Sequence, residues 1–452
     1  MQTTTSNIVS DMKRTFFGLS VIIWHFLFSQ AAAQTLVECY EAAERNYPLI
    51  RQYDLISKTS ELTVKNIGKG WLPQVSASAQ ATYQSDVMAW PGQMQTMLQT
   101  MGIDLKGLKK EQYKIGIDVQ QMLYDGGAIS SQKEIARQQG QLQLAQNDVM
   151  LYQVRQRVNE MYFALLLLED RMRLNGDLQQ LYASSEKKLE SMYRNGTAAE
   201  SDFLTVRAER LNVVQQNTEL ESQRQALQRM LSVFCGMEVN SEKISKPSLS
   251  AVGSSLSAGE SSVPVSGSLQ QRPELTVFDA QLSLANAQEK ALDAALMPKL
   301  GIFAQGYYGY PGLNMFEDMM RHEMSLNGII GARLSWSIGA LYTRKNDKAK
   351  IELQREATEN QRAVFLFNNN LEQIRQNENI GRYRKLMADD EEIIRLRSAV
   401  RKSAESKLQH GIIAVNDLVR EINAENAAKV QQSVHEIEML KEIYDLEYSK
   451  GK

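Results

Sequence analysis

Cysteine and histidine are scarce in this 452-residue chain. The two cysteines, Cys39 and Cys235, are too few for a disulfide framework, and the four histidines are scattered without the spacing of metal ligands. We favour two buried thiols over a Cys39–Cys235 bridge. The sequence also has no nucleophile–base pattern. We therefore expect no catalytic residues, no metal site and no cofactor site.

The chain also has little net charge and few prolines. The formal net charge is −2, from 51 basic and 53 acidic side chains, and there is no dense block of lysine and arginine. Nucleic-acid binding is therefore not expected. The chain has only eight prolines, and none occurs between Gly127 and Pro247. Because proline breaks helices, this distribution favours long helices over a compact enzyme.

A long apolar run occurs only near the start. Residues 16–28 are apolar, follow two basic residues and lead into the small residues of "SQAAAQ". This pattern predicts a cleaved signal peptide over residues 1–33, with cleavage near Ala33, and leaves open whether translation starts at Met1 or Met12. We expect the mature protein to be extracytoplasmic. Later runs fall short of the roughly 18 apolar residues of a spanning helix, so we expect strands to make any membrane crossing.

The two halves of the chain resemble each other. The motif "WLPQV" recurs as "LMPKL" 225 residues later, and "YRNGTAAESDFL" recurs as "LQHGIIAVNDLV" 215 residues later. Each half has the same predicted order of helix, strand, loop, strand, very long helix, turn and helix. We therefore predict two structural repeats, residues 34–240 and 271–452. Between them, residues 241–270 contain eleven serines and are predicted to form a linker or equatorial segment around the helices.

Two very long helices are predicted, over residues 128–194 and 341–409. At 1.5 Å per residue each would extend about 100 Å, which a single compact domain cannot hold. Apolar residues in the first helix recur at alternating steps of three and four, the seam of a supercoiled helix pair. The seam residues are Leu151, Val154, Val158, Met161, Leu165, Leu168 and Met172.

Four segments switch to strict alternation of apolar and polar residues. They are residues 75–84, 113–120, 299–310 and 329–338, and they predict two β-hairpins, about residues 74–123 and 299–338. The alternation in the third segment is blurred, because Phe303 and Tyr307 share the face of Lys299 and Gln305.

Proline marks the start of each hairpin. Pro73 and Pro298 lie where a helix must stop and a strand must begin, because proline lacks an N–H group and disfavours helix in the residue before it. Both prolines are therefore predicted helix-to-strand transition residues.

Alternating segments of about ten residues are typical of membrane β-barrels, although a soluble half-buried sheet alternates equally well. In a barrel the apolar side chains would face lipid. The polar residues Lys114, Asp118 and Arg333 would line a wet channel lumen. Four strands cannot close a barrel, and open edges are not viable in lipid. The barrel must therefore be shared between subunits, and a wet channel favours twelve strands over eight.

The ordered duplication resembles the TolC-like outer-membrane efflux family, also called outer membrane factors, over about residues 35–448. The resemblance rests on the "LP" and "MP" transitions, the "YDGG" and "SIGA" strand-to-helix junctions, and the twice-written turn "RNGTAAESDFLTVRAE" and "QHGIIAVNDLVREINAE". It implies a mainly α-helical chain with membrane strands. It also implies a homotrimer with four strands per chain in a twelve-stranded barrel, continued by a long helical periplasmic tunnel.

The resemblance also implies a function, partners and a location. The protein would be the passive exit channel of a tripartite efflux or secretion system. A periplasmic adaptor (membrane fusion) protein and an inner-membrane pump of the RND or ABC type would open its periplasmic tip. It would lie in the lipid of the outer membrane of a Gram-negative bacterium, with a large periplasmic part. The alternative is a periplasmic coiled-coil adaptor or scaffold without a channel of its own.

The repeated turns are the predicted functional ends of the helices. Gly196 and Gly411 fit helix ends with a left-handed backbone. The resemblance implies that the adaptor docks on these turns. The docking surface would consist of Gly196 with Thr197 and of Gly411 with Ile412. One acid follows each glycine by six residues, in the first turns of the next helix, where negative charge is favoured.

These acids, Asp202 and Asp417, have two interpretations. They are either helix caps or, as the resemblance implies, a carboxylate ring at the closed tip that holds cations and filters traffic. The second gate acid of the family would fall on Thr205 or Arg420, so the usual doubled ring is absent. Arg420 is instead interpreted as a latch that pairs with Asp202 of the neighbouring half.

Overall fold

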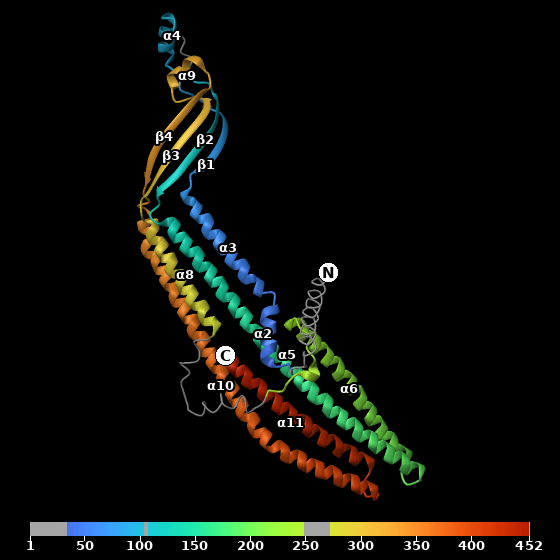
Figure 1. Ribbon diagram of the computed structural model, residues 1–452. Coiled ribbons are helices and arrows are strands. Elements are labelled where there is room, and N and C mark those ends of the chain that lie inside the picture. The colour runs from blue at the N-terminus through green and yellow to red at the C-terminus, as the bar shows by residue number, and fades with distance from the viewer. Residues whose placement is uncertain (1–33, 104–106, 248–271, 452) are drawn as a thin grey trace, which may run out of the picture. The chain divides into compact units, whose positions relative to one another are not determined.

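The computed structural model describes residues 34–103, 107–247 and 272–451 (Figure 1). The predicted signal peptide and most of the predicted linker lie outside the described residues. The chain divides into two compact units, and each repeat contributes to both. A sheet unit comprises Gln52–Gln146 and Glu274–Val364, and a helical unit comprises Met1–Arg51, Asn147–Pro273 and Phe365–Lys452.

The sheet unit contains one four-stranded antiparallel sheet with the order β1-β2-β3-β4. Its strands are β1 (Gln74–Tyr83), β2 (Glu111–Tyr124), β3 (Lys299–Tyr310) and β4 (Ser325–Ser335). The two strands of each predicted hairpin pair with each other, and β2 pairs with β3. The central ladder therefore joins the two halves of the sequence.

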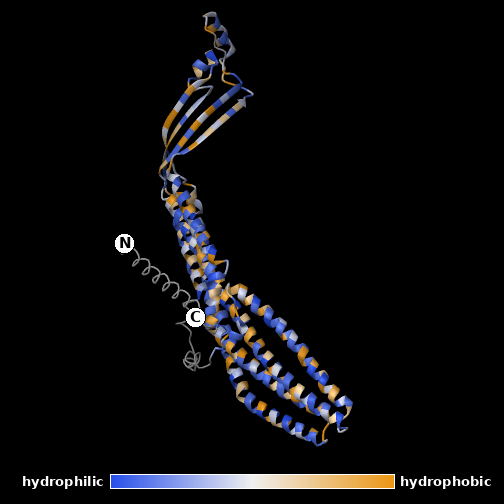
Figure 2. Cartoon of the chain, turned by 45° about the vertical axis from the view of Figure 1, so that its right-hand side comes forward, coloured by the Kyte–Doolittle hydropathy of each residue, from blue (hydrophilic) through white to orange (hydrophobic). Residues whose placement is uncertain are grey.

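The register places most of the apolar residues of the four strands on one face. One row across the sheet runs Ala79, Ile115, Tyr308 and Leu326. This face is uncovered: Leu326 and Ile330 are 82% and 85% exposed. The strands alternate between apolar and polar colours in Figure 2. We call the two sides the apolar face and the polar face.

The fourth strand differs from the prediction. It covers Ser325–Ser335 rather than residues 329–338, so Trp336 and Ile338 lie beyond it although they continue the alternation. The ladder ends where Lys299 pairs with Ser335, because the residue before Lys299 is Pro298, which has no N–H group to donate. The Trp336 indole instead donates a hydrogen bond to the Leu296 carbonyl at 2.9 Å.

Short helices connect the elements of the sheet unit. Helix α3 (Ile50–Gly68) and the 3-10 helix η1 (Lys69–Trp71) precede Pro73 and β1, and α8 (Pro273–Ala295) precedes Pro298 and β3. The hairpin loops contain α4 (Gly92–Thr100) and α9 (Met315–Arg321). The two hairpins contact each other here, since the Lys109 N–H in the first loop donates to the hydroxyl of Tyr310, the last residue of β3, at 2.8 Å.

The two long helices have the predicted bounds to within one residue. They are α5 (Ala128–Arg194) and α10 (Ala340–Gln409), and both pass from the sheet unit into the helical unit. The helical unit also contains α2 (Leu36–Asn46), the 3-10 helix η2 (Ser241–Lys243), α6 (Glu200–Cys235) and α11 (Val415–Ser449). Among the helices of the described ranges, none is long and apolar enough to cross a membrane.

The buried face of α5 is wider than the predicted seam. Five of the seven seam residues are buried, whereas Met161 and Met172 are only partly buried. Tyr162, Phe163 and Leu166 are also buried, at 0%, 1% and 6% exposure. Contacts on more than one side therefore cover α5, as in a helix packed within a bundle rather than in a simple pair.

The two cysteines are free thiols, and both are buried, as favoured from the sequence. They come together where α2 packs on α6, and the Cys235 Sγ lies 3.6 Å from the Cys39 carbonyl oxygen. They contribute to the core of the helical unit.

Candidate functional site

The turn between α5 and α6 is a tight left-handed helix stop. Gly196 has φ of +74°, a conformation that favours glycine. The N–H of Thr197 donates to the Met192 carbonyl and the N–H of Gly196 donates to the Tyr193 carbonyl, both at 2.9 Å. This pair of bonds is the Schellman motif, which satisfies carbonyls that the end of a helix leaves unpaired.

The turn between α10 and α11 repeats this geometry. Gly411 has φ of +66°, and Ile412 N–H donates to the Lys407 carbonyl at 2.9 Å. A Cβ atom added at Gly196 or at Gly411 would meet no atom within 4 Å, and Ile412 is 68% exposed. Both turns therefore present free surface in the described chain.

A single hydrophobic core holds the four helices next to these turns. It joins α5, α6, α10 and α11, so the two turns belong to one packed body. Its buried residues are Leu178, Tyr182, Leu189, Val206, Val213, Ala404, Val415, Leu418, Val419 and Ile422.

Asp202 acts as a helix cap. It is the third residue of α6, and its carboxylate accepts a hydrogen bond from the N–H of Ala199, the N-cap residue, at 3.2 Å. The contact is one half of a capping box, and the negative charge lies where the helix dipole favours it.

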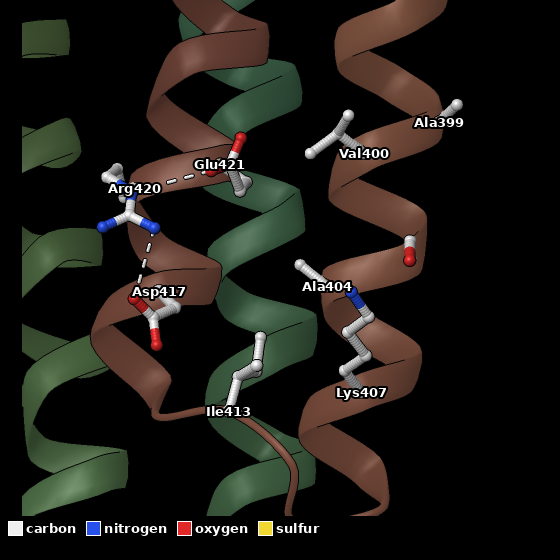
Figure 3. Close-up of a pocket in the computed structure, with 9 residues that line it drawn as sticks. Ala399, Val400, Ala404, Lys407, Ile413, Asp417, Arg420 and Glu421 are labelled. Atoms are coloured by element: carbon white, nitrogen blue, oxygen red, sulfur yellow. Dashed lines mark ion pairs between the residues drawn. The ribbon is translucent and has the colours of Figure 1, made fainter.

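Asp417 occupies the corresponding place in α11 but has a different partner. Its Oδ1 lies 3.3 Å from Nη2 of Arg420, and Nε of Arg420 lies 3.6 Å from Oε1 of Glu421 (Figure 3). Within one copy Arg420 therefore pairs with residues of its own helix, and the suggested pairing of Arg420 with Asp202 stays a prediction. Residues three apart on a helix are neighbours, so Arg420 reaches Asp417, while the Asp202 carboxylate serves the N-cap of its own helix.

A groove with a volume of about 610 Å³ opens beside this ion pair. Residues from the last turns of α10 line one side, and Ile413 and the start of α11 line the other (Figure 3). Four charged side chains line it: Lys407, Asp417, Arg420 and Glu421. Arg420 is 70% exposed and Asp417 is 42% exposed, so solvent reaches their ion pair.

Glu421 was not identified from the sequence. Its side chain is only 17% exposed and also lies 3.7 Å from Arg397 of α10, so it connects the groove to the neighbouring helix. The available signal was its position four residues after Asp417, which places both acids on one side of α11.

The predicted lumen residues lie on the polar face of the sheet. Lys114 is opposite Gln80, Asp118 is opposite Ser76, and Arg333 is opposite Gly301. Asp118 accepts a hydrogen bond from the Gln305 amide at 2.6 Å. The three predicted residues share this face, although they do not form one cluster.

Two aromatic residues on β3 support the cations of this face. The Lys114 ammonium lies 3.9 Å from the centre of the Tyr307 ring, and the Arg333 guanidinium lies 5.1 Å from the centre of the Phe303 ring. Both are cation–π contacts. Phe303 and Tyr307 thus explain the blurred alternation of the third segment. Sequence reasoning missed their role, although the break in alternation was the signal.

No group of three or more His, Cys, Asp or Glu side chains that could hold a metal ion occurs in the described ranges.

Part of the chain matches a protein-family model. Residues 39–236 match the model of the family described as "Outer membrane efflux protein". No curated protein matches the sequence.

Several solved structures are similar in fold. The outer-membrane channel OprN is 14% identical, with a TM-score of 0.65 over 92% of this chain and 89% of that chain. The outer membrane protein VceC of Vibrio cholerae is 14% identical, with a TM-score of 0.62 over 92% and 96%. The open state of the Neisseria gonorrhoeae MtrE channel is 15% identical, with a TM-score of 0.62 over 92% and 88%. The family match thus covers residues 39–236, and the similarity over 92% of the chain shows that the chain has the TolC-like fold of these outer-membrane channels.

Proposed function

We propose that three copies of this chain form a passive exit channel in the outer membrane, as one part of a tripartite efflux or secretion system. The observation that carries this proposal is the four-stranded sheet, which has one exposed apolar face and one polar face. A soluble sheet would cover its apolar face with helices or a second sheet. Lipid is the surrounding in which an uncovered apolar face is stable.

The edges of the sheet support the number of copies. Within the described ranges no further strand pairs with the outer edges of β1 and β4. Unpaired N–H and C=O groups are costly in lipid, so the edges of neighbouring copies must pair until the sheet closes. Three copies give a barrel of about twelve strands, wide enough for a wet lumen lined by the polar face.

The tip of the helical unit is the proposed gate. Asp202, Asp417 and Arg420 lie at the helix starts that follow the two glycine turns. Glu421 lies with Asp417 and Arg420 in the groove. Both side chains of the Asp417–Arg420 pair lie on α11 and are exposed, so a neighbouring copy can compete for either of them. We assign this pair to the closed state of the tip.

The exposed turns are the proposed docking surface for the periplasmic adaptor protein. Gly196 with Thr197 and Gly411 with Ile412 form two similar motifs on one packed body, so one partner can engage both. An inner-membrane pump of the RND or ABC type would supply the energy through that adaptor.

Adjacent substitutions on β1 test the channel. Ala79→Lys places a charge on the apolar face, and Ser78→Lys places the same charge on the polar face. A lysine facing mid-bilayer lipid costs about 2–4 kcal/mol, whereas one facing water costs little. Ala79→Lys is therefore expected to reduce the trimer in outer-membrane fractions, while Ser78→Lys is retained at the wild-type level. Cross-linking and planar-bilayer recordings then measure the copy number and the conductance.

The coiled-coil adaptor is the alternative outcome. An adaptor would remain soluble without detergent, would tolerate both substitutions equally, and would give no conductance steps. Any such result for the signal-cleaved chain would replace the channel with the adaptor.

A further inference from the structure

The polar face of the sheet carries an excess of positive charge. The strand register places three cations there, Lys114, Lys299 and Arg333, against the single carboxylate of Asp118. The other positions of this face on the described strands are uncharged. When charges of one sign line a lumen and its walls have a low dielectric constant, ions of the opposite sign become concentrated in the lumen.

Two of these cations share a hollow. A cavity of about 180 Å³ lies where β3 begins and β4 ends, and Lys299, Arg333, Phe303, Gln74 and Gln120 are among its lining residues. The two cations and the Gln120 amide can donate hydrogen bonds to an anion, whereas the Gln74 amide already donates to the Lys69 and Leu72 carbonyls. An arginine guanidinium is a planar fork that matches carboxylate and sulfonate oxygens, and lysine adds a point charge.

An aromatic ring forms part of the same hollow. Phe303 lies opposite Gly331 on the polar face, and a Cβ atom at Gly331 would lie 2.8 Å from Cζ of the Phe303 ring. The ring therefore lies against the backbone of β4, in space that only glycine leaves open. Arg333 stacks 5.1 Å from the ring centre, so the cation and the aromatic surface are held next to each other.

We propose that this hollow is a binding site for aromatic organic anions, which makes such anions a favoured cargo class of the channel. The proposal rests on the proposed function, because it requires the polar face to line a lumen. The anionic group binds Arg333 and Lys299, and the aromatic part of the ligand packs on Phe303. The amide of Gln120 completes the polar contacts.

The test is ion flow through the purified trimer in planar bilayers, with p-toluenesulfonate as the aromatic anion and methanesulfonate as the aliphatic anion. We expect p-toluenesulfonate to block chloride current at lower concentration than methanesulfonate. The Lys299→Gln/Arg333→Gln chain is expected to weaken this block about tenfold and to shift the reversal potential in a KCl gradient toward cation preference. Phe303→Leu is expected to weaken the block by p-toluenesulfonate alone.

Two control variants accompany these measurements. Arg333→Lys keeps the charge and is expected to keep the reversal potential. Arg45→Gln removes one charge from an exposed position of α2 and is expected to change neither quantity.

The outcomes separate the two proposals. If the Lys299→Gln/Arg333→Gln chain conducts with the block and the reversal potential of the wild type, that result overturns the anion site and leaves the channel intact. Equal block by the two sulfonates would also overturn it. The absence of conductance steps from every chain would instead overturn the channel itself.

Discussion

Arg401 of α10 and Glu425 of α11 form an ion pair in which the side chains are only 14% and 6% exposed. The residues 215 positions earlier, Glu186 and Arg210, form the corresponding pair between α5 and α6 at 2.6 Å, with the two charges exchanged. The same offset relates the two glycine turns. The repeats have therefore kept the contact between neighbouring helices while reversing its polarity.

The first prediction concerns this pair. Arg401→Glu or Glu425→Arg alone is expected to destabilise the protein by about 3 kcal/mol or more, because each leaves like charges facing each other in a poorly solvated position. The exchanged double variant is expected to recover a large part of that loss, since the first repeat has this polarity. Lys429 lies 2.9 Å from Glu425 and favours an acid there, which limits the recovery. Circular dichroism during denaturation measures each effect.

The exposed pair of Lys58 and Asp54 is the matched control for this prediction. Its side chains are 66% and 70% exposed, so reversing either charge is expected to cost less than about 0.5 kcal/mol. If the double variant of Arg401 and Glu425 is no more stable than either single variant, the helix pair does not accept the exchanged charges and the prediction is wrong.

The second prediction concerns the gate. Asp417→Ala and Arg420→Ala are each expected to raise single-channel conductance, because each removes one side of the pair assigned to the closed tip. The double variant is expected to conduct like either single variant, since both remove the same contact. Asp202→Ala and Asp417→Ala are also expected to weaken block by divalent cations. If all of these variants have the conductance and the cation block of the wild type, Asp202 and Asp417 act only as helix caps.

The third prediction concerns the turn glycines. Gly411→Ala forces a Cβ atom into a left-handed conformation and is expected to cost about 1 kcal/mol. Gly381 is the matched control, because it lies within α10 and a Cβ atom there would meet nothing within 4 Å. Gly381→Ala is expected to stabilise the protein by about 0.5–1 kcal/mol. Thermal unfolding followed by circular dichroism should therefore give shifts of opposite sign.

The fourth prediction concerns pH. Burial raises the pKa of Asp445 to about 6, and an amide hydrogen bond from Asn159 at 3.3 Å only partly offsets this. The folded state therefore holds this proton more tightly than the unfolded state, whose pKa is near 3.8. The resulting penalty is absent below about pH 4, grows as the pH rises to about 6, and is constant above that.

Asp445→Asn tests this assignment, because it keeps an acceptor for Asn159 and removes the charge. The variant is expected to be more stable than the wild type by about 1–3 kcal/mol at pH 7.5 and equally stable at pH 4. Asp389→Asn changes an exposed acid of α10 and should have little effect at either pH. A stabilisation by Asp445→Asn that does not vary with pH would argue against a raised pKa.

Local features were predictable because neighbouring residues determine them. The bounds of α5 and α10 follow from the absence of proline and from the glycine stops, and both stops have the expected left-handed backbone. The strands followed from alternation, but β4 was misplaced by several residues because its end depends on Pro298, which precedes the neighbouring strand β3. The repeated turn motif located the two turns at Gly196 and Gly411, whose role in docking stays a prediction.

Relationships between distant residues were not predictable in the same way. The sequence by itself determined the duplication, the helices, the turns and the two faces of the strands, because periodicity and backbone preference act over a few residues. Only the tertiary structure decided that Phe303 and Tyr307 support Arg333 and Lys114, and that Asp202 caps its helix while Asp417 binds Arg420. Those outcomes depend on strand register and helix packing, which bring together side chains that no short sequence pattern relates.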